Sequence, residues 1–253
     1  MKQFKDRVFI ITGASSGMGR STALLFAKEG ANLILSGRNE KNGNKLLREL
    51  KALGNESYFH YGDIGFEQTN RELVRIAVAS YGKLDGIICH AGMLGLGAVT
   101  EISQEIWTKT FQVNVDAVFN LSRFAIPEFL RMGKGVILIN SSIAAFKAFP
   151  NHPAYCASKA AVQSLGRQLA LEYGPEIRVA IICPGPVDTP MIRRSTVAFD
   201  NPADIVESTR LSLPMKRLGT PDDIAELTLF LCSDRASWIT GASITVDGGK
   251  TVQ

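Results

Sequence analysis

Short β-branched runs alternate with longer helical patterns along the whole chain of 253 residues, and this alternation constrains the fold more than any other feature. The strand candidates lie at residues 7–12, 31–37, 56–63, 85–92, 135–142, 178–185 and 243–249. Several are continuously apolar, as strands are when helices cover both faces of a parallel sheet. The pattern predicts a single α/β domain over residues 1–253, with a doubly wound sheet of seven parallel strands and helices on both faces. The stretch 103–132 reads as one long helix.

Composition excludes several other classes of protein. Hydrophobic residues make up 45% of the chain, which is enough for a sizeable core. The formal net charge is +4 and the basic residues are scattered, so we expect no nucleic-acid partner. No apolar run is long enough to span a bilayer, and the amino-terminal apolar run leads straight into a glycine-rich turn, as a first strand does. We therefore expect a cytoplasmic protein that does not bind membranes.

The four cysteines are far apart and form no C-x-x-C pair. Cys89 and Cys183 lie inside apolar runs of the strand type. Free thiols are the expected state for most of the four, and no metal site is expected.

Residues 186–218 interrupt the alternation, because they carry four prolines and no strand pattern. A connection of this length inside a compact domain is usually functional. We interpret it as a substrate lid, with a solvated surface excursion as the alternative.

A glycine-rich turn, T-G-A-S-S-G-M-G, follows the first strand and opens a helix. Its glycines, Gly13, Gly17 and Gly19, permit a tight turn and let the backbone approach a diphosphate at the helix amino terminus. In open α/β sheets, ligands bind outside the carboxyl ends of the strands, where this turn lies. The turn predicts a dinucleotide site; a turn needed only for packing is the alternative.

The end of the second strand bears on the choice of cofactor. An acidic residue there would bind the ribose hydroxyl of NAD, whereas an arginine pairs with the 2′-phosphate of NADP. The chain has Gly37 and then Arg38, so NADP(H) is favoured and NAD(H) remains possible. Arg38 could instead stack on the adenine or face solvent. Asp63, at the end of the third strand, could accept a hydrogen bond from the adenine amino group or cap its own loop.

Tyr155 and Lys159 are four residues apart among small side chains, and therefore share a helix face. The lysine charge is expected to lower the tyrosine pKa, which makes a phenol useful in acid–base chemistry. Ser142 follows the preceding strand and can reach the start of this helix. Asn114 lies among apolar residues and must satisfy its amide, which it could do through a water leading to Lys159. A surface Tyr–Lys pair is the alternative.

These ordered motifs resemble the short-chain dehydrogenase/reductase family over essentially the whole chain, and in particular its 3-oxoacyl-carrier-protein reductase-like branch. The family has a Rossmann fold, and its catalytic Asn, Ser, Tyr and Lys match Asn114, Ser142, Tyr155 and Lys159. The cofactor site that the resemblance implies comprises Gly13, Ser15, Ser16, Gly17, Met18, Gly19, Arg38, Asp63, Ile64, His90, Ala91, Gly92, Tyr155, Lys159, Pro184, Gly185, Val187 and Thr189.

The resemblance implies hydride transfer between a nicotinamide and a carbonyl or secondary alcohol. Tyr155 would exchange a proton with the reacting oxygen, Lys159 would lower the tyrosine pKa, Ser142 would stabilise that oxygen, and Asn114 would position a relay water. A 3-oxoacyl thioester is an alternative substrate. A catalytically weak regulator or scaffold of the same fold is the alternative function.

The chain departs from the family after the fourth strand, where Cys89-His90-Ala91-Gly92 replaces Asn-Asn-Ala-Gly. The small Ala91-Gly92 pair is kept, but an asparagine that ties neighbouring strands is replaced by His90. We expect His90 to be a satisfied structural histidine and not a catalyst.

The small-molecule substrate pocket is expected to involve the residues after Ser142, His152 and the lid. The lid side chains singled out are Met191, Ile192, Arg193, Arg194, Val197, Phe199, Asp204, Ile205 and Leu211. Arg131, Lys134 and the two lid arginines are candidates for docking a carrier protein. The family resemblance also implies a homotetramer.

Overall fold

The computed structural model describes residues 2–199 and 202–253 of the chain. Its centre is a sheet of seven parallel strands in the order β3-β2-β1-β4-β5-β6-β7. The strands are β1 (Val8–Thr12), β2 (Asn32–Gly37), β3 (Tyr58–Tyr61), β4 (Gly86–Cys89), β5 (Gly135–Asn140), β6 (Ile177–Pro184) and β7 (Ala242–Val246). The predicted fold class is confirmed, and each strand overlaps its predicted run, with ends that differ by at most three residues.

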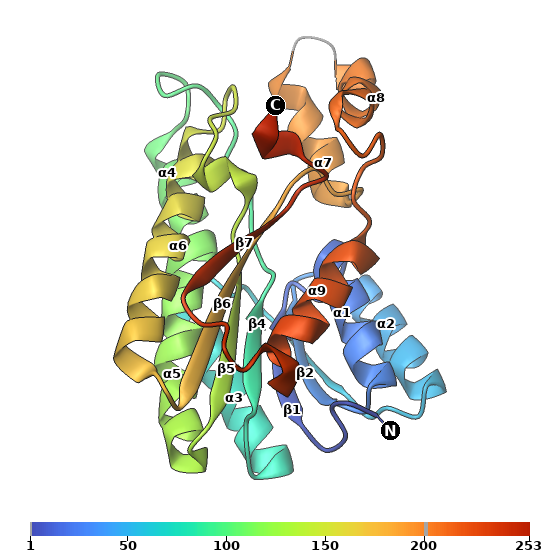
Figure 1. The fold of residues 1–253 in the computed structure, drawn as a ribbon, viewed down its shortest axis with the longest axis vertical. Coiled ribbons are helices and arrows are strands. Elements are labelled where there is room, and N and C mark those ends of the chain that lie inside the picture. Colours follow the sequence, from blue (N-terminus) through green and yellow to red (C-terminus); the bar gives the residue numbers. More distant parts are fainter. Residues whose placement is uncertain (1, 200–201) are drawn as a thin grey trace.

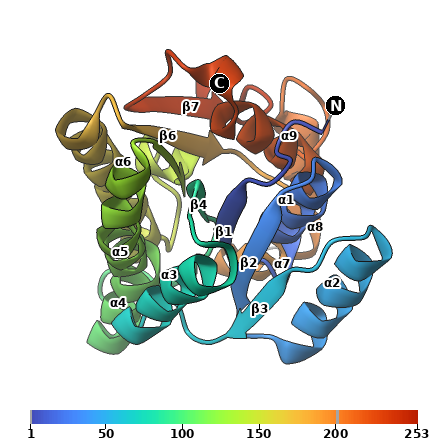
Figure 2. The same cartoon turned by 90° about the horizontal axis from the view of Figure 1, so that it is seen from below.

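Helices cover both faces of the sheet (Figure 2). One side carries α1 (Gly17–Lys28), α2 (Glu40–Ala52) and α9 (Pro221–Cys232). The other carries α3 (Glu67–Tyr81), α4 (Gln104–Phe111), α5 (Ala117–Met132) and α6 (Pro153–Tyr173). Each face has its own apolar core: along β1, Val8 and Ile10 pack toward one layer, and Phe9 and Ile11 toward the other. The central strands are apolar throughout because both of their faces are buried.

The chain direction across the sheet reverses at β1, which pairs with β2 on one side and with β4 on the other. Loops therefore leave the carboxyl ends of β1 and β4 in opposite directions and open a crevice between them. The glycine-rich turn follows β1 at this point, so the fold places it where such sheets bind ligands.

The long helix predicted over 103–132 is interrupted in the structure. The π-helical segment η1 (Gln112–Asp116) separates α4 from α5 and contains Asn114. A π turn inserts an extra residue into the helical spiral and is often found at functional sites. Sequence periodicity does not reveal this π-helical segment, because the groups that hydrogen-bond to the Asn114 side chain come from other parts of the chain.

The predicted lid contains α7 (Pro190–Ser195), the 3-10 turn η3 (Thr196–Ala198) and α8 (Pro202–Ser212). It rises above the carboxyl end of the sheet, beside the carboxyl terminus of the chain (Figure 1). The single bridge Val187↔Gly219 joins its two ends, so the segment leaves the sheet and returns at one place.

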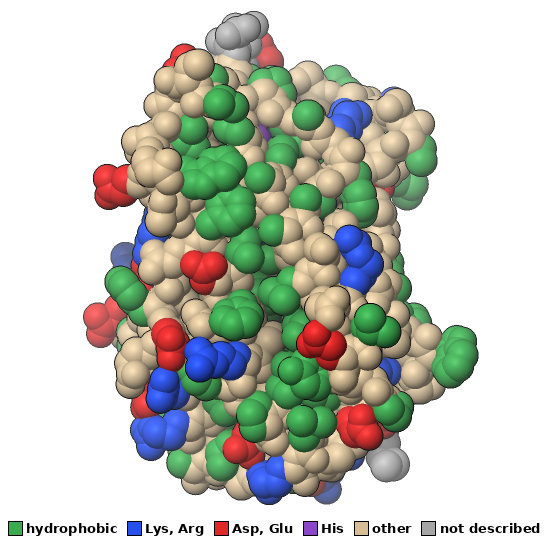
Figure 3. Space-filling model, turned by 90° about the vertical axis from the view of Figure 1, so that its left-hand side faces the viewer, with side chains coloured by type: hydrophobic (Ala, Val, Ile, Leu, Met, Phe, Trp, Pro, Cys, Tyr) green, Lys and Arg blue, Asp and Glu red, His purple; other side chains and the backbone are tan. Residues whose placement is uncertain are grey.

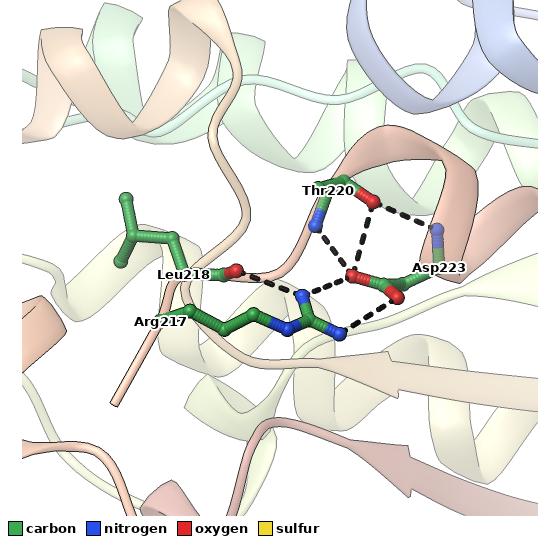
Figure 4. Close-up of polar contacts among 4 residues, drawn as sticks. All are labelled: Arg217, Leu218, Thr220 and Asp223. Carbon is green, nitrogen blue, oxygen red and sulfur yellow. Dashed lines mark hydrogen bonds and ion pairs between the residues drawn. The ribbon is translucent and has the colours of Figure 1, made fainter. Parts of the chain in front are cut away.

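A polar cluster fixes the return of this segment into α9 (Figure 4). The Thr220 hydroxyl accepts a hydrogen bond from the Asp223 amide, and the Asp223 carboxylate accepts one from the Thr220 amide, which forms a capping box. Arg217 donates to both carboxylate oxygens of Asp223, over 2.6 and 2.9 Å. Arg217 and the cap hold the pKa of Asp223 well below its usual range, so the clamp stays ionised.

Candidate active site

A cavity of about 380 Å³ opens at the carboxyl ends of β1, β2, β3 and β4. The predicted cofactor residues that line it are Gly13, Ser15, Ser16, Gly17, Met18, Gly19, Arg38, Asp63, Ile64, His90, Ala91, Gly92 and Thr189. The structure therefore brings together residues that are as much as 176 positions apart, from Gly13 to Thr189. Ser36, Asn39, Asn42 and Val113 also line this cavity and were not predicted.

The glycines of the first turn are required by close backbone approaches. Gly13 has φ +68°, and a Cβ atom there would lie 2.8 Å from the Ala91 amide nitrogen. A Cβ at Gly19 would lie 2.5 Å from the Gly13 carbonyl oxygen, and one at Gly17 would lie 3.1 Å from Thr189 Cγ2. Side chains here would fill the cavity floor, so the turn has the form of a cradle for a ligand that approaches the main chain.

Arg38 and Asp63 line this cavity just after the ends of β2 and β3. Arg38 is exposed, and no carboxylate within the described residues forms an ion pair with it. Asp63 pairs with Lys109 over 2.9 Å and accepts a hydrogen bond from the Gly65 amide. Partial burial favours the neutral acid, but the Lys109 and Gly65 hydrogen bonds outweigh it and lower the pKa of Asp63. Asp63 thus caps its own loop, as the second reading of the sequence had it.

His90 is 8% exposed, and its Nε2 lies 3.0 Å from the Thr22 hydroxyl oxygen. Its Nδ1 is buried and has no hydrogen-bond partner in the described part of the chain. Burial, assisted by the Lys159 charge, lowers the pKa of His90 to about 3, so the ring is neutral at ordinary pH. His90 therefore links the end of β4 to α1 through one ring nitrogen, which is a structural role. The hydrogen-bonding capacity of its other ring nitrogen is not satisfied.

A second cavity of about 440 Å³ adjoins the first and shares Met18, His90, Gly92, Thr189 and Met191 with it. The remaining predicted cofactor residues line it, namely Tyr155, Lys159, Pro184, Gly185 and Val187. Ser142 and His152 also lie in its wall. The wall is closed by apolar side chains of the lid, Met191, Ile192, Phe199 and Ile205.

Tyr155 and Lys159 share one face of α6, as their spacing predicts. The Lys159 Nζ lies 5.6 Å from the centre of the Tyr155 ring and donates a hydrogen bond to the Asn140 carbonyl over 2.7 Å. Burial raises the pKa of Tyr155 to about 12, opposed in part by a hydrogen bond with Ser142. The prediction that Lys159 lowers the tyrosine pKa is wrong for this structure, because desolvation of the phenolate dominates and the ammonium is directed at Asn140.

Burial also acts on the lysine and lowers the pKa of Lys159 to about 8. The two shifts have one cause, since removing water disfavours the charged form of each group. At neutral pH the pair is therefore a protonated phenol beside a lysine that is close to losing its charge. That state is suited to giving a proton to an oxygen bound between Ser142 and Tyr155.

Asn114 lies at the back of this site and is 1% exposed. Its Oδ1 accepts from the Met93 amide, and its Nδ2 donates to the Met93 carbonyl and to Ser158 Oγ, each over 2.9 Å. The amide is thus satisfied by protein groups, and not by Lys159. Asn114 and Lys159 nevertheless border the same space, because a Cβ added at Gly92 would lie 3.4 Å from Asn114 Oδ1 and 3.6 Å from Lys159 Nζ.

The basic residues considered for carrier-protein docking do not come together. Arg131 lies in the last turn of α5 and Lys134 directly precedes β5, so both lie at the amino-terminal edge of the sheet. The lid rises above the opposite, carboxyl edge (Figure 1). Arg131 pairs with Glu128, and Arg193 pairs with Asp188. Arg194 lines the first cavity and not the second. The four candidates therefore do not form one docking surface, since Arg131 and Lys134 lie at the opposite end of the sheet from the two lid arginines.

The other lid candidates separate as well. Val197 is 70% exposed and Leu211 is 52% exposed, so neither belongs to the pocket wall.

Among the four cysteines, Cys89, Cys183 and Cys232 are buried free thiols and Cys156 is partly exposed. In residues 2–199 and 202–253, no helix combines the length and apolar character of a membrane span.

The fold and the two joined cavities define a Rossmann-type protein with a glycine-lined cavity beside a tyrosine–lysine site. A family profile described as "Enoyl-(Acyl carrier protein) reductase" matches residues 13–251. The chain is 35% identical to an uncharacterized oxidoreductase of Thermotoga maritima, over 98% of each chain. It is 34% identical to the cyclohexanol dehydrogenase of an Acinetobacter species, over 98% of this chain and 96% of the relative. It is 31% identical to a 3-oxoacyl-[acyl-carrier-protein] reductase of Thermotoga maritima, over 99% and 100%.

Solved structures agree with these relatives. Levodione reductase superposes with a TM-score of 0.94 at 29% identity, over 98% of this chain and 99% of that one. The NADPH complex of a variant of actinorhodin polyketide ketoreductase gives a TM-score of 0.92 at 27% identity, over 96% of both chains. The chain belongs to the short-chain dehydrogenase/reductase family. It is an oxidoreductase acting on CH–OH groups, and its family supports the use of a nicotinamide cofactor.

Proposed function

We propose that this chain is an NADP-preferring oxidoreductase that interconverts a carbonyl compound and a secondary alcohol through Tyr155, Lys159, Ser142 and Asn114. The observation that carries the proposal is the joining of the two cavities: the glycine cradle opens directly into the space walled by Ser142, Tyr155 and Lys159. A ligand bound in the cradle can thus present one end to a substrate held at the tyrosine.

The cradle fits a dinucleotide. Gly13, Gly17 and Gly19 leave no room for side chains, and the amino terminus of α1 favours a diphosphate there. Thr189 borders the passage between the cavities, where the nicotinamide end would lie. When bound, the nicotinamide supplies or accepts a hydride. Side chains of this chain would orient the substrate and transfer the proton.

Tyr155 is the proposed acid in the direction of reduction. Its raised pKa keeps the phenol protonated over the physiological range, so it can donate to the substrate oxygen as negative charge develops there. Ser142, whose hydroxyl accepts from the Ala144 amide, would turn its own proton from Tyr155 to the same oxygen when a substrate is bound. These two donors would orient the carbonyl and stabilise its developing charge.

Lys159 is proposed to restore the proton of Tyr155 and to bind the nicotinamide ribose. Its ammonium lies between the tyrosine ring and the Asn140 carbonyl. Asn114 Oδ1 borders the same space beside Gly92 and would position a relay water there. The π-helical segment η1 supports this role, because it brings Asn114 into line with Met93 and Ser158.

The preference for NADP(H) over NAD(H) rests on Arg38. Arg38 lines the first cavity, and Glu40, the nearest acid along the chain, does not. A 2′-phosphate would pair with this free cation, whereas the ribose hydroxyl of NAD would meet no carboxylate directly after β2.

The substrate is proposed to be a small carbonyl compound covered by residues 186–218 acting as a lid. Met191, Ile192, Phe199 and Ile205 give the second cavity an apolar wall. A 3-oxoacyl thioester remains the alternative substrate. It is less well supported now that the basic docking residues are divided between opposite ends of the sheet.

The proposed assembly is a homotetramer. On the face formed by α4, α5 and α6, apolar side chains gather along the helices (Figure 3). Ile106 is 39% exposed, Phe119 is 50% exposed and Leu171 is 80% exposed. Exposed apolar patches of this kind commonly mark interfaces, and a second copy of the chain is the occupant that the family favours.

The test follows oxidation of NADPH and NADH against acetoacetyl thioesters, keto-sugars, diketones, quinones and ketosteroids. Tyr155→Phe should bind cofactor normally and lose about 10²- to 10⁴-fold in turnover. Tyr58→Phe, a change on the half-exposed edge strand β3, is the matched control and should retain activity. Most activity remaining in Tyr155→Phe would refute the assignment. Tight NADPH binding without turnover in either direction would favour a regulator.

A further inference from the structure

His152 has a defined tautomer. The Nδ1 atom lies 2.5 Å from the main-chain carbonyl oxygen of Pro150. A carbonyl oxygen can only accept a hydrogen bond, so Nδ1 must carry the proton. In the neutral ring Nε2 is then an acceptor, since the two nitrogens of a neutral imidazole divide the roles between them.

The acceptor nitrogen faces the second cavity. His152 is 6% exposed and lies in the wall of that cavity. Within residues 2–199 and 202–253, Nε2 forms no hydrogen bond. It is also not one of the fully buried polar atoms of these residues that lack a partner, so it remains accessible. His152 therefore offers an open acceptor to whatever occupies the cavity, in contrast to His90, whose spare nitrogen is shut inside the protein.

Aromatic rings surround this acceptor close to the reacting position. The His152 ring lies 6.2 Å from Phe149, 6.1 Å from Tyr155 and 6.4 Å from Phe199, measured between ring centres. Once a substrate displaces water, the two phenylalanine rings offer Nε2 no donor, and the Tyr155 proton is directed at the reacting oxygen. A buried acceptor left without a donor is costly, so the site discriminates in favour of a substrate that brings one.

The charges of the cavity restrict what that donor is. Lys147, Lys159 and Lys250 contribute to the wall, and no aspartate or glutamate of the described residues does. An ammonium donor would be repelled by these three cations without any compensating carboxylate. A neutral donor therefore fits, and the simplest one that a substrate can carry beside its carbonyl carbon is a hydroxyl.

Resting on the proposed function, the geometry points to His152 as a specificity-determining residue that selects α-hydroxy ketones and the corresponding vicinal diols. The His152 and Tyr155 ring centres are 6.1 Å apart, so the two residues are neighbours that two oxygens on adjacent carbons could contact together. The carbonyl oxygen gains a proton from Tyr155 and its carbon gains the hydride supplied by the nicotinamide. The neighbouring hydroxyl donates to His152 Nε2 and is unchanged by the reaction.

The experiment compares matched pairs of substrates. Each α-hydroxy ketone, such as 2-hydroxycyclohexanone or 1-hydroxy-2-butanone, is paired with its α-methoxy ether. The ether keeps the electron-withdrawing oxygen but has no proton to donate. Wild-type kcat/KM should favour the hydroxy member by about 10- to 100-fold. The ratio should fall toward one in His152→Phe and be partly retained in His152→Gln, whose amide oxygen is an acceptor. His60→Phe, on the edge strand β3, is the control and should leave the ratio unchanged.

A ratio near one in the wild type, or one that is the same in wild type and His152→Phe, overturns the inference. If no pair turns over, the vicinal diols and their monomethyl ethers are titrated into the enzyme with NADPH bound, followed by the fluorescence of the reduced cofactor. Equal affinity for both members, or no binding of the diols, overturns it equally. A His152-dependent ratio with full activity in Tyr155→Phe would instead refute the proposed mechanism and leave the His152 assignment standing.

Discussion

The ammonium of Lys159 donates a hydrogen bond to the Asn140 carbonyl over 2.7 Å at a position where the lysine is only 3% exposed. No carboxylate of the described residues forms an ion pair with it. Burial lowers the pKa of Lys159 to about 8, although the neighbouring Cys183 and Cys89 act in the opposite sense. The protein therefore keeps a destabilising cation beside Tyr155, as expected if the site is maintained for chemistry and not for stability.

Replacing this lysine should stabilise the protein at neutral pH. The pKa falls from 10.5 to about 8 on folding, which is equivalent to about 3 kcal/mol against the folded state. That penalty is fully present below about pH 8. It disappears as the pH rises toward 10.5, because the unfolded chain binds the proton more tightly in this window. Lys159→Met also loses one hydrogen bond, worth about 1 kcal/mol.

We therefore expect Lys159→Met to unfold with a free energy about 2 kcal/mol higher than wild type at pH 7, with the difference lost or reversed by pH 10.5. Urea unfolding at the two pH values measures it. Lys134→Met, at an exposed site, should show no such pH dependence. An equal effect of Lys159→Met at both pH values would show that the lysine is not desolvated as described.

Gly13→Ala should prevent cofactor binding through a steric clash. Gly13 has φ +68°, and the new Cβ would lie 2.8 Å from the Ala91 amide nitrogen. Gly54→Ala is a close control, since Gly54 has φ +74° and nothing within 4 Å of the added atom. Both changes carry the left-handed strain of about 1 kcal/mol, but only the first carries the clash.

Thermal unfolding and NADPH titration of both variants test this prediction. Gly13→Ala should be more destabilised than Gly54→Ala and should not bind NADPH at concentrations that saturate wild type. Equal stability and equal binding in the two variants would mean that the glycine turn is not a cradle.

Arg38→Asp should change the choice of cofactor. The substitution removes the cation proposed to bind the 2′-phosphate and supplies a carboxylate for the ribose hydroxyls. We expect NADPH affinity to fall about 10- to 100-fold while NADH affinity is unchanged or improved. Fluorescence titration with the two cofactors measures both. Arg48→Asp, an exposed change on the same side of the sheet in α2, should alter neither. NADPH affinity that survives in Arg38→Asp would argue against the NADP preference.

Phe119→Glu should break the proposed tetramer. The side chain is 50% exposed on α5, and a charge buried in an interface without a partner is strongly unfavourable. Light scattering should report a smaller species than wild type. Leu53→Glu, a comparably exposed apolar position after α2, should leave the assembly intact. A tetramer that tolerates Phe119→Glu would place the interface elsewhere, and a monomeric wild type would refute the assembly altogether.

Local patterns in the sequence were sufficient for the parts of the protein that depend on neighbours along the chain. Continuous apolar runs such as Val8–Thr12 and Gly135–Asn140 predicted buried parallel strands, because only double-sided burial tolerates them. The glycine spacing after β1 predicted the cradle. The four-residue spacing of Tyr155 and Lys159 placed both on one face of α6.

The tertiary structure decided what depends on distances between elements. Met93 and Ser158, the partners of Asn114, lie 21 and 44 residues away along the chain, and no local pattern indicates them or the π turn that accommodates them. The two lid arginines are adjacent in sequence, yet one pairs with Asp188 and the other borders the first cavity.

The pKa values of Tyr155 and Lys159 show most clearly what the sequence predicts and what only the tertiary structure decides. The sequence determined that a phenol and an ammonium share a helix face beside a strand-end serine, and charge alone then predicts a lowered tyrosine pKa. Packing decided how much water reaches them, and desolvation raises the pKa of Tyr155 and lowers that of Lys159. Spacing along a helix fixes which groups are neighbours, but the free energy of a charge depends on everything that surrounds it, and only the folded chain supplies those surroundings.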